Sequence, residues 1–443
     1  MQSARAAAAA GAAGDAVKSA ATPIQAPAAE RQEPIDDLHV YPNVFAHFRP
    51  PAMDRQTVPN LSSPGRSVTA RRWDVFCKVV DNFGDIGVCW RLARQLHDEH
   101  GIHVVLWLDD PASLARLCPD ASAHARTQWL DGVTVERWDD ATVVDELGEV
   151  VVEAFACTVP ASAIALMRTL APPPVWLNLE YLSAEDWVGG CHRLASPQGH
   201  GLQKFFFFPG FTADTGGLIA ERETLAARAG WGAHARAHLL GALKVKPRDG
   251  ALLVSLFAYE NDALAGLLDA WAGGDAPIHC LVPEGRILPQ LLAWLGEPLA
   301  VGETVARGAL TVSVLPFVRQ SDYDRLLWSC DLNFVRGEDS FVRAQWARTP
   351  LVWHIYRQDE EAHLIKLDAW LALWLAGLPQ PVRQATTDFI HAWNRGLDAG
   401  AAWPRFAAAL PQLRMHAGPW AERLLANGNL ADNLVNFTQA KLK

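Results

Sequence analysis

Short apolar runs of strand length alternate with stretches of helical periodicity along most of this chain. In the first half, residues 74–80 (DVFCKVV) precede a glycine-containing loop, helical spacing of apolar residues over 88–100, and a second strand-like run at 102–108. Strand, loop, helix and strand in this order form a βαβ unit, which requires a parallel sheet. Further strand-like runs at 149–153 and 175–179 extend the pattern. The first half is therefore predicted to be Rossmann-like.

The alternation starts again after a polar segment at 241–250, which is the natural hinge. The second series of strand-like runs covers residues 251–257, 278–282, 310–315, 331–335 and 351–355. Because a domain usually has about 150 residues, a chain of 443 residues fits two such domains and a tail. We predict an α/β protein with two Rossmann-like domains facing a central cleft, with limits at 72–240 and 241–425 and a helical segment at 426–443. Ligands bind such folds at the carboxyl ends of the strands.

Composition excludes several classes of protein. Residues 1–71, rich in Ala, Pro, Ser and Gln, are predicted to be a disordered or low-complexity tail. A secretory signal is the competing interpretation, although the Ala stretch lacks the Leu or Val of an h-region. No apolar stretch approaches the ~20 residues of a membrane helix, and a net charge of −10 repels nucleic acid.

The cysteines indicate a reducing compartment. The chain has 7 cysteines, they occur singly, and none forms a C-x-x-C pair. This pattern argues against both a disulfide framework and a thiolate zinc site. We expect a cytoplasmic protein.

The loop after the first strand has carboxylates where a nucleotide site has glycines or a lysine. Neither G-x-G-x-x-G nor a P-loop is present; the loop has Gly84 and Gly87 for tight turning, and the acids Asp81 and Asp85. Acids repel a pyrophosphate, so this loop suits a cationic or proton-losing acceptor. The structural alternative is that both aspartates are helix N-cap or Asx-turn residues.

The segment 334–343 (FVRGEDSFVR) has the features of a phosphate cradle. Arg336 and Gly337 stand where a strand gives way to a helix, and Ser340 follows in the first turn. The free backbone N–H groups of a helix N-terminus bind anions, and Arg336 adds bidentate contacts. Glu338 would receive sugar hydroxyls or hold Arg336 in place. The alternative is an acidic first turn that complements the helix dipole.

Other side chains at strand ends are candidates for the nucleobase and diphosphate, although each aromatic residue alone is more often a packing residue. These candidates are Phe257, Tyr259, Phe317, Gln320 and Tyr356. The D-x-D at 322–324 resembles a metal-diphosphate signature, but we favour Ser321 and Asp322 as helix caps. The block 204–211 (KFFFFPGF) is predicted to be a buried strand and turn, with an acceptor-facing role as the alternative.

Four motifs together resemble the EarP family, the bacterial protein-arginine rhamnosyltransferases of translation elongation factor P. They are 81–96 (DNFGDIGVCWRLARQL), 178–183 (NLEYLS), 204–217 (KFFFFPGFTADTGG) and 336–347 (RGEDSFVRAQWA). The resemblance runs from about residue 72 to the C-terminus, whereas the tail before it has no counterpart in the family.

The resemblance implies a GT-B fold and an inverting mechanism without metal or cofactor. It also implies dTDP-β-L-rhamnose as the donor and one arginine of elongation factor P as the acceptor, in the second and first domains respectively. By motif, Asp85 would be the general base supported by Asp81, and Glu338 the other catalytic carboxylate. The residues that would contact the donor are Asn82, Arg336, Gly337, Glu338, Asp339 and Ser340, with Phe257, Tyr259, Phe317, Gln320 and Tyr356 around the thymidine and diphosphate.

Three rival functions stay open at this point. A GT-B enzyme with a small-molecule or lipid acceptor would usually have a membrane-docking helix in its first half, and none is evident. A nucleotide-sugar sensor would keep the 336–340 cradle but would not need Asp85. An NAD-dependent oxidoreductase is disfavoured by the missing glycine fingerprint.

Overall fold

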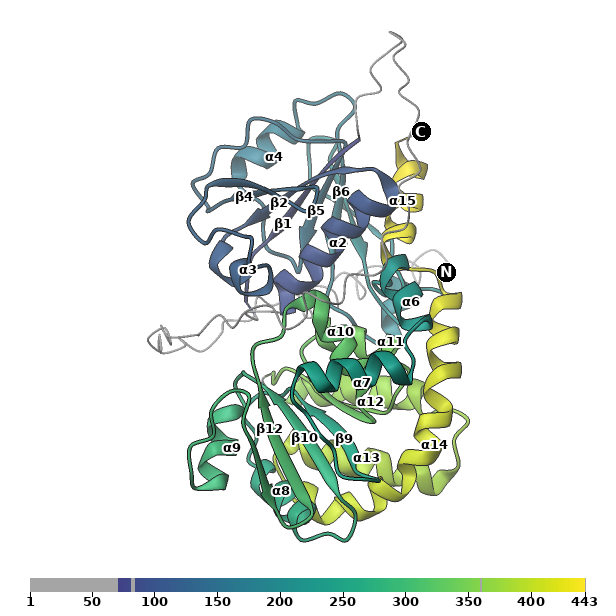
Figure 1. The fold of residues 1–443 in the computed structure, drawn as a ribbon. Coiled ribbons are helices and arrows are strands. Elements are labelled where there is room, and N and C mark those ends of the chain that lie inside the picture. The colour runs from purple at the N-terminus through teal and green to yellow at the C-terminus, as the bar shows by residue number, and fades with distance from the viewer. Residues whose placement is uncertain (1–70, 81–83, 359–360, 443) are drawn as a thin grey trace, which may run out of the picture.

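The computed structural model describes residues 71–80, 84–358 and 361–442. The expected tail, except for Arg71, lies outside these ranges, as do Asp81 and Asn82. The described chain forms two lobes, one above the other in Figure 1, and each is built on its own sheet. None of the described helices is both long and apolar enough to cross a membrane.

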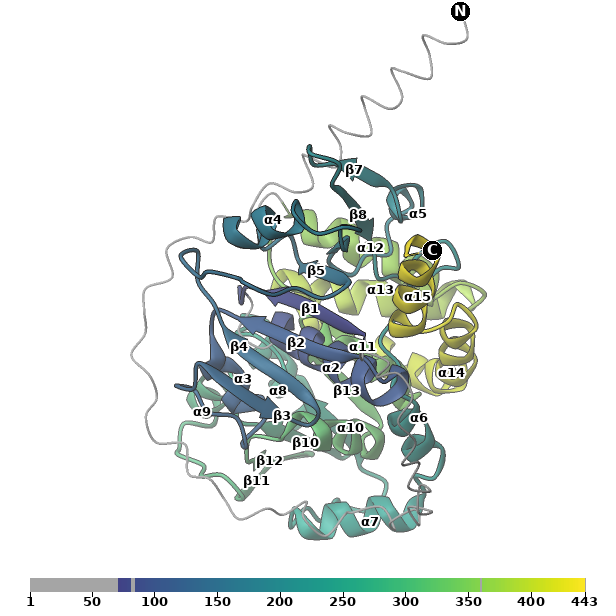
Figure 2. The ribbon, with the colours of Figure 1, turned by 90° about the horizontal axis from the view of Figure 1, so that it is seen from above.

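The sheet of the first lobe has eight strands in the order β3-β4-β2-β1-β5-β6-β8-β7. Its inner pairs are parallel, and the edge strands β3 and β7 are antiparallel to their neighbours and lie on opposite sides of Figure 2. The strands are β1 (Arg72–Cys77), β2 (His103–Leu108), β3 (Thr127–Leu130), β4 (Val133–Arg137), β5 (Val150–Ala154), β6 (Val175–Leu179), β7 (Ala195–Pro197) and β8 (Gln203–Phe207). Every residue of β5 and β6 is buried, as expected for parallel strands covered on both faces.

The helices of the first half include the connector to the second sheet. They are α2 (Gly84–His100), α3 (Pro111–Leu117), α4 (Ala161–Met167), α5 (Trp187–Cys191), α6 (Arg222–Ala229) and α7 (Ala233–Ala242). Helix α2 follows β1 and lies on the side of the first lobe that faces the second (Figure 1). Its residues 85–93, 95 and 96 are buried, because the helix packs on the first sheet and also against α11 of the other lobe.

The sheet of the second lobe has six strands in the order β11-β12-β10-β9-β13-β14, of which only the β11–β12 pair is antiparallel. The strands are β9 (Leu252–Leu256), β10 (Ile278–Pro283), β11 (Thr304–Arg307), β12 (Leu310–Leu315), β13 (Leu332–Arg336) and β14 (Leu351–His354). The helices that follow β9 are α8 (Leu264–Ala272), α9 (Leu288–Leu295), α10 (Gln320–Ser329), α11 (Asp339–Ala347), α12 (Ala362–Trp374), α13 (Gln380–Arg395), α14 (Ala399–Ala426) and α15 (Leu430–Lys441).

In each sheet, the strand that comes first in the sequence lies between two later strands, so the order of strands changes direction there. Strand β1 has β2 on one side and β5 on the other, and β9 has β10 on one side and β13 on the other. Ligands bind open α/β sheets outside the carboxyl ends of strands at such switch points. The two segments with candidate site residues, 84–87 and 336–340, follow β1 and β13. The topology therefore brings both segments to the space between the lobes.

The last helix returns to the first lobe. Residues Leu430, Ala431, Leu434 and Val435 of α15 belong to the hydrophobic core formed by β1, β2, β5, β6 and α2. Figures 1 and 2 both show α15 beside the first lobe, after the long α14 has run along the second. The domain limits at 240/241 and 425/426 stay predictions. Helix α15, which follows the second limit, packs on the first lobe.

Two local expectations are wrong. Helix α2 begins at Gly84, so Asp85 lies in its first turn and Gly87 lies within the helix rather than in a tight turn. Helix α10 begins at Gln320 with Arg319 as N-cap, so Ser321 and Asp322 lie in its first turn and neither is the cap. In contrast, β6 and β12 have the predicted limits. The block 204–211 contains most of β8, but this strand is only half buried, and the turn lies after the block, at 212–215. The alternating pattern therefore predicted strands better than helix starts.

Candidate active site

The first of two pockets between the lobes collects most of the predicted donor-binding residues. It encloses about 630 Å³ of space that is partly open to solvent, and Gly84 and Leu117 line it from the first lobe. The predicted residues that line it are Phe257, Tyr259, Phe317, Gln320, Arg336, Asp339 and Ser340. We call it the donor-side pocket. All but Asp339 and Ser340 come from strands or strand ends of the second lobe, or from the loop and helix start after β12.

Arg336 is the cation of the donor-side pocket. It is the last residue of β13, it is 8% exposed, and its guanidinium carbon lies 4.6 Å from the ring centre of Phe257 and 4.7 Å from that of Tyr259. A guanidinium between two aromatic rings is oriented by cation–π attraction. This arrangement presents a fixed, permanently charged group to an anionic ligand.

The second pocket lies on the other side of the 336–340 segment and has a volume of about 610 Å³. The predicted residues that line it are Asp85, Gly337, Glu338 and Tyr356. We call it the acceptor-side pocket. It is lined from both lobes, since Tyr181 and Leu182 follow β6 whereas Lys366 lies on α12. Gly84 borders both pockets, so the two adjoin at the start of α2.

Two of the three predicted catalytic carboxylates, Asp85 and Glu338, lie in the acceptor-side pocket, whereas Asp81 lies outside the described residues. Asp85 is 3% exposed, and its Oδ2 accepts a 2.9 Å hydrogen bond from the backbone N–H of Val80. Glu338 belongs to the other lobe, where Oε1 accepts a 3.0 Å hydrogen bond from the N–H of Leu182. Each carboxylate therefore has a backbone donor that orients it, and a carboxylate from each lobe faces the same space. Such a pair attracts a cationic group.

The structure gives Asp339 and Ser340 partners within the protein. The Ser340 hydroxyl accepts the N–H of Arg336 at 2.9 Å and donates to the carbonyl of the same residue, so it ties the turn after β13. Asp339 is paired with Arg91 and Arg343. Burial alone would raise the pKa of Asp339, but the guanidinium groups of Arg343 and Arg91 lower it to about 2. Asp339 is thus an ionised member of the pocket wall.

A polar cluster lies at the ends of β5 and β6, next to the acceptor-side pocket. Asn178 donates a hydrogen bond to Glu180, and Lys204 pairs with Glu153 at 3.0 Å. Burial, with repulsion from the Glu153 carboxylate, raises the pKa of Glu180 to about 7, while Lys204 and Lys366 oppose the shift. The cluster does not by itself assign a function to any of these residues. It does place Glu180, an acid with a pKa of about 7, beside the acceptor-side pocket.

Sequence reasoning missed several residues of the two pockets. Glu284 follows β10 directly and accepts the N–H of Phe317 at 2.9 Å. Tyr181 follows β6 and stacks on Phe155, with ring centres 4.6 Å apart. The rule that ligands bind at strand ends would have found both of them. Tyr323 and Lys366 lie on helices, and no local signal marks them.

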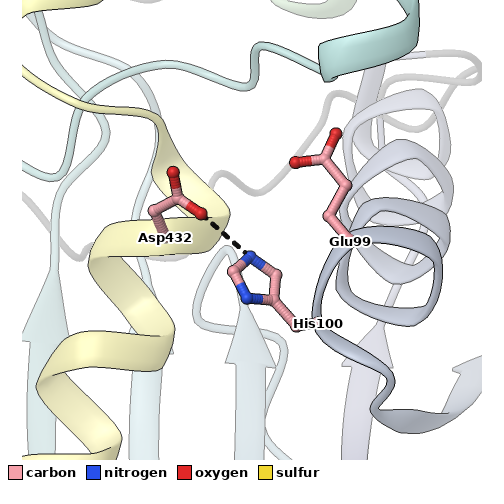
Figure 3. A group of neighbouring side chains, drawn as sticks. All are labelled: Glu99, His100 and Asp432. Carbon is pink, nitrogen blue, oxygen red and sulfur yellow. Dashed lines mark ion pairs between the residues drawn. The ribbon is translucent and has the colours of Figure 1, made fainter.

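One group of possible metal ligands occurs among the described residues, away from both pockets. Figure 3 shows Glu99 and His100 at the end of α2 facing Asp432 of α15, with His100 Nε2 and Asp432 Oδ1 3.1 Å apart. The Arg222 guanidinium lies 3.5 Å from Glu99 and 3.3 Å from Asp432. Since Arg222 pairs with both carboxylates, and the Arg222 backbone N–H and the Gln95 amide also donate to Glu99, the group is an ion-pair and hydrogen-bond cluster that joins α15 to α2.

The D-x-D aspartates are also engaged in ion pairs. Asp322 pairs with Arg325 at 2.9 Å, and Asp324 pairs with Arg343 at 2.6 Å. This removes the observation that could have favoured a metal-diphosphate site at 322–324.

Two Rossmann-like domains with ligand pockets between their strand ends define the GT-B class of glycosyltransferases, as expected from the sequence. Residues 73–439 match the family described as "Elongation-Factor P (EF-P) rhamnosyltransferase EarP". The chain belongs to this family, and it is an enzyme.

Relatives of high similarity support the assignment. A protein-arginine rhamnosyltransferase of Pseudomonas putida is 54% identical over 84% of this chain and 99% of its own length. One of Pseudomonas aeruginosa is 51% identical over 82% of this chain and 98% of its own length. A solved structure described as the basis for EarP-mediated arginine glycosylation of translation elongation factor EF-P is 43% identical, with a TM-score of 0.60, over 84% of this chain and 99% of that chain.

Proposed function

We propose that this enzyme transfers L-rhamnose from dTDP-β-L-rhamnose to one arginine side chain of translation elongation factor P. The modified factor would then relieve ribosomes stalled at polyproline, which sets the reaction in the cytoplasm. Support comes from relatives at 51–54% identity that are protein-arginine rhamnosyltransferases, and from a structural neighbour that concerns arginine glycosylation of EF-P. The single observation that carries the proposal is the 336–340 segment, which walls an aromatic, cationic pocket on one side and a two-carboxylate pocket on the other.

The donor-side pocket suits a nucleoside diphosphate. Arg336 and the N-terminus of α11 would bind the diphosphate, because a guanidinium and a helix N-terminus both attract anions. Phe257, Tyr259 and Phe317 offer aromatic surface for the thymidine. The sugar would then lie next to Gly337 and Glu338, at the border with the acceptor-side pocket.

The acceptor-side pocket suits an arginine side chain. A guanidinium has a pKa above 12 and a free Asp about 4, so removing the proton before attack would cost roughly 8 units, or about 11 kcal/mol. Asp85 therefore acts late: it hydrogen-bonds the terminal nitrogen, turns it toward the anomeric carbon, and takes the proton as the C–N bond forms. Glu338 holds the guanidinium or sugar from the opposite side.

The reaction is a single displacement at the anomeric carbon. The bond from this carbon to the diphosphate oxygen breaks, the electron pair leaves with TDP, and the bond to nitrogen forms on the opposite face. One displacement without a covalent sugar intermediate inverts the configuration. Arg336 and the α11 N-terminus stabilise the leaving diphosphate electrostatically, so we propose that neither a metal nor a cofactor is required.

One experiment separates this function from its rivals. The enzyme is incubated with elongation factor P and dTDP-rhamnose, and the acceptor is weighed intact and after digestion by mass spectrometry. We expect a gain of one deoxyhexose on an arginine. An unmodified factor together with tight TDP binding would favour a nucleotide-sugar sensor or a small-molecule acceptor and would overturn the proposal.

A further inference from the structure

A buried ion cluster joins the two helices that begin at the proposed reaction centre. Arg91 of α2 donates to Glu221 through Nε and Nη2, at 2.6 and 2.7 Å, and to Asp339 of α11 through Nη1, at 2.8 Å. Arg91 is 2% exposed. It uses both edges of its planar guanidinium, so its position is fixed relative to two carboxylates at once. Glu221 precedes α6 in the connector, and Asp339 lies in the second lobe.

Asp339 is held from its own lobe as well. Its Oδ2 accepts hydrogen bonds from Arg343 Nε at 3.1 Å and from Gln320 Nε2 at 3.0 Å, and Arg343 also pairs with Asp324 at 2.6 Å. The Gln320 amide donates in addition to the backbone carbonyl of Gly87 at 3.2 Å. Helices α10 and α11 therefore both contact α2 through directional bonds. On α2 these bonds involve Gly87 and Arg91, which follow Asp85, and on α11 they involve Asp339, the residue after Glu338.

The close approach of the helices depends on a glycine. A Cβ at Gly87 would lie 3.1 Å from Cγ and Oδ2 of Asp339 and 3.1 Å from Nε2 of Gln320. These are side-chain atoms already held by two or three bonds each, so they cannot move aside without loosening the cluster. A methyl group at Gly87 would therefore require a shift of a few tenths of an ångström, either in the cluster or between α2 and α11. The second glycine of the DNFGDIG segment thus sets an inter-lobe distance.

We propose that Arg91 and Gly87 are positioning residues that fix α2 against α11 and thereby set the distance between Asp85 and the 336–340 segment. The two lobes hold one alignment in which the proposed base and the donor cradle face each other before substrates arrive. This inference rests on the proposed function, because it assigns the reaction centre to the residues at the two helix starts. Burying charged groups costs desolvation free energy, but the directional bonds of a buried ion pair favour a single geometry of the two helices.

The alternative is that the cluster only holds the lobes together. In that case its loss would lower thermal stability, but the remaining folded enzyme would turn over normally. Misplacement of reacting groups has a different effect, since a shift of about 1 Å can cost roughly a hundredfold in rate while binding persists. Turnover at saturation, measured separately from TDP affinity and from melting temperature, therefore distinguishes the two roles.

The test compares Gly87→Ala and Arg91→Lys with Arg94→Met, a control on the same helix. The partly exposed Arg94 side chain pairs with Asp131 at 3.5 Å and lies over the Trp90 ring, so it takes no part in the cluster. For each variant we would measure kcat at saturating dTDP-rhamnose and elongation factor P, the Kd for TDP by calorimetry, and the melting temperature. We expect Gly87→Ala to lower kcat about 10- to 100-fold with a TDP Kd within threefold of wild type. Arg91→Lys should lose kcat as well, because an ammonium cannot bridge both carboxylates, and Arg94→Met should match wild type.

A wild-type kcat in folded Gly87→Ala, with only the melting temperature lowered, would overturn the proposal. If Gly87→Ala does not fold, Arg91→Lys decides by the same criterion. Failure of the proposed function is recognised separately, since wild-type enzyme and Arg94→Met would then not modify elongation factor P in the same assay.

Discussion

The carboxylate of Glu338 in the second lobe accepts a hydrogen bond from the backbone N–H of Leu182 in the first, at 3.0 Å. This bond crosses the space between the lobes at the rim of the acceptor-side pocket. The same side chain lines the pocket that also contains Asp85. The contact thus orients one candidate catalytic acid with a group from the opposite lobe.

Glu338→Gln separates the orientation of this side chain from its charge. The amide oxygen can still accept the Leu182 N–H, so we expect an unchanged melting temperature and a TDP Kd within a few-fold. Loss of the negative charge should lower rhamnosyl transfer by about 100-fold or more. Transfer is followed by mass spectrometry of elongation factor P, and near-normal rates would remove Glu338 from the reaction.

Asp85→Asn tests the proposed base. The asparagine oxygen can keep the bond from the Val80 N–H, so the start of α2 should be preserved. We expect turnover to fall by ~100-fold or more, as for other general bases, with TDP affinity within a few-fold in calorimetry. Turnover close to that of wild type would refute the assignment.

Arg336→Ala tests the donor-side pocket. Hydrogen bonds to charged groups contribute about 1.5–3 kcal/mol, so TDP should bind roughly 10- to 100-fold more weakly. The matched control is Arg286→Ala, because Arg286 also lies near the Tyr259 ring, at 5.6 Å, but pairs with the exposed Glu260. Calorimetry that gives both variants the same TDP affinity as wild type would exclude Arg336 from the site.

Glu180→Gln should change stability in a pH-dependent way. The folded pKa of Glu180 is raised from 4.5 to about 7, so its contribution to stability is full below pH 4.5 and is lost as pH rises to 7. Glutamine does not ionise and avoids this loss. The free energy of unfolding of the variant, relative to that of wild type, should therefore rise by about 1–3 kcal/mol between pH 4.5 and pH 8. Urea unfolding at the two pH values measures this gain. The exposed Glu223→Gln serves as control, and an equal difference at both pH values would contradict the prediction.

Leu434→Ala tests the docking of α15 on the first lobe. Leu434 is fully buried among residues of the first core, so its truncation should cost about 2–5 kcal/mol of unfolding free energy. Gln439→Ala, an exposed change on the same helix, should cost little. Chemical denaturation measures both. Equal midpoints would show that α15 contributes little to the lobe.

The sequence was sufficient to predict what depends on local pattern. Apolar runs bounded by turns predicted the inner strands, and strand ends predicted residues such as Phe257 and Arg336 that meet in one pocket. The sequence was not sufficient to predict contacts between residues that lie far apart along the chain. The Arg91–Asp339 pair joins positions 248 residues apart, and neither residue differs locally from any helical arginine or aspartate. Gly87 was expected to lie in a turn. The local sequence could not show why a glycine is needed there, because the side chains that leave no room for a Cβ, Asp339 and Gln320, belong to the other lobe.

The return of α15 has a consequence for how this protein is made. Residues 430–435 complete a core whose other strands were synthesised more than 220 positions earlier, with the entire second sheet in between. During translation, part of the apolar surface of the first lobe therefore stays uncovered until residues 430–435 have left the ribosome. A nonsense or frameshift change upstream of residue 430 would remove this helix and so damage the lobe that is translated first.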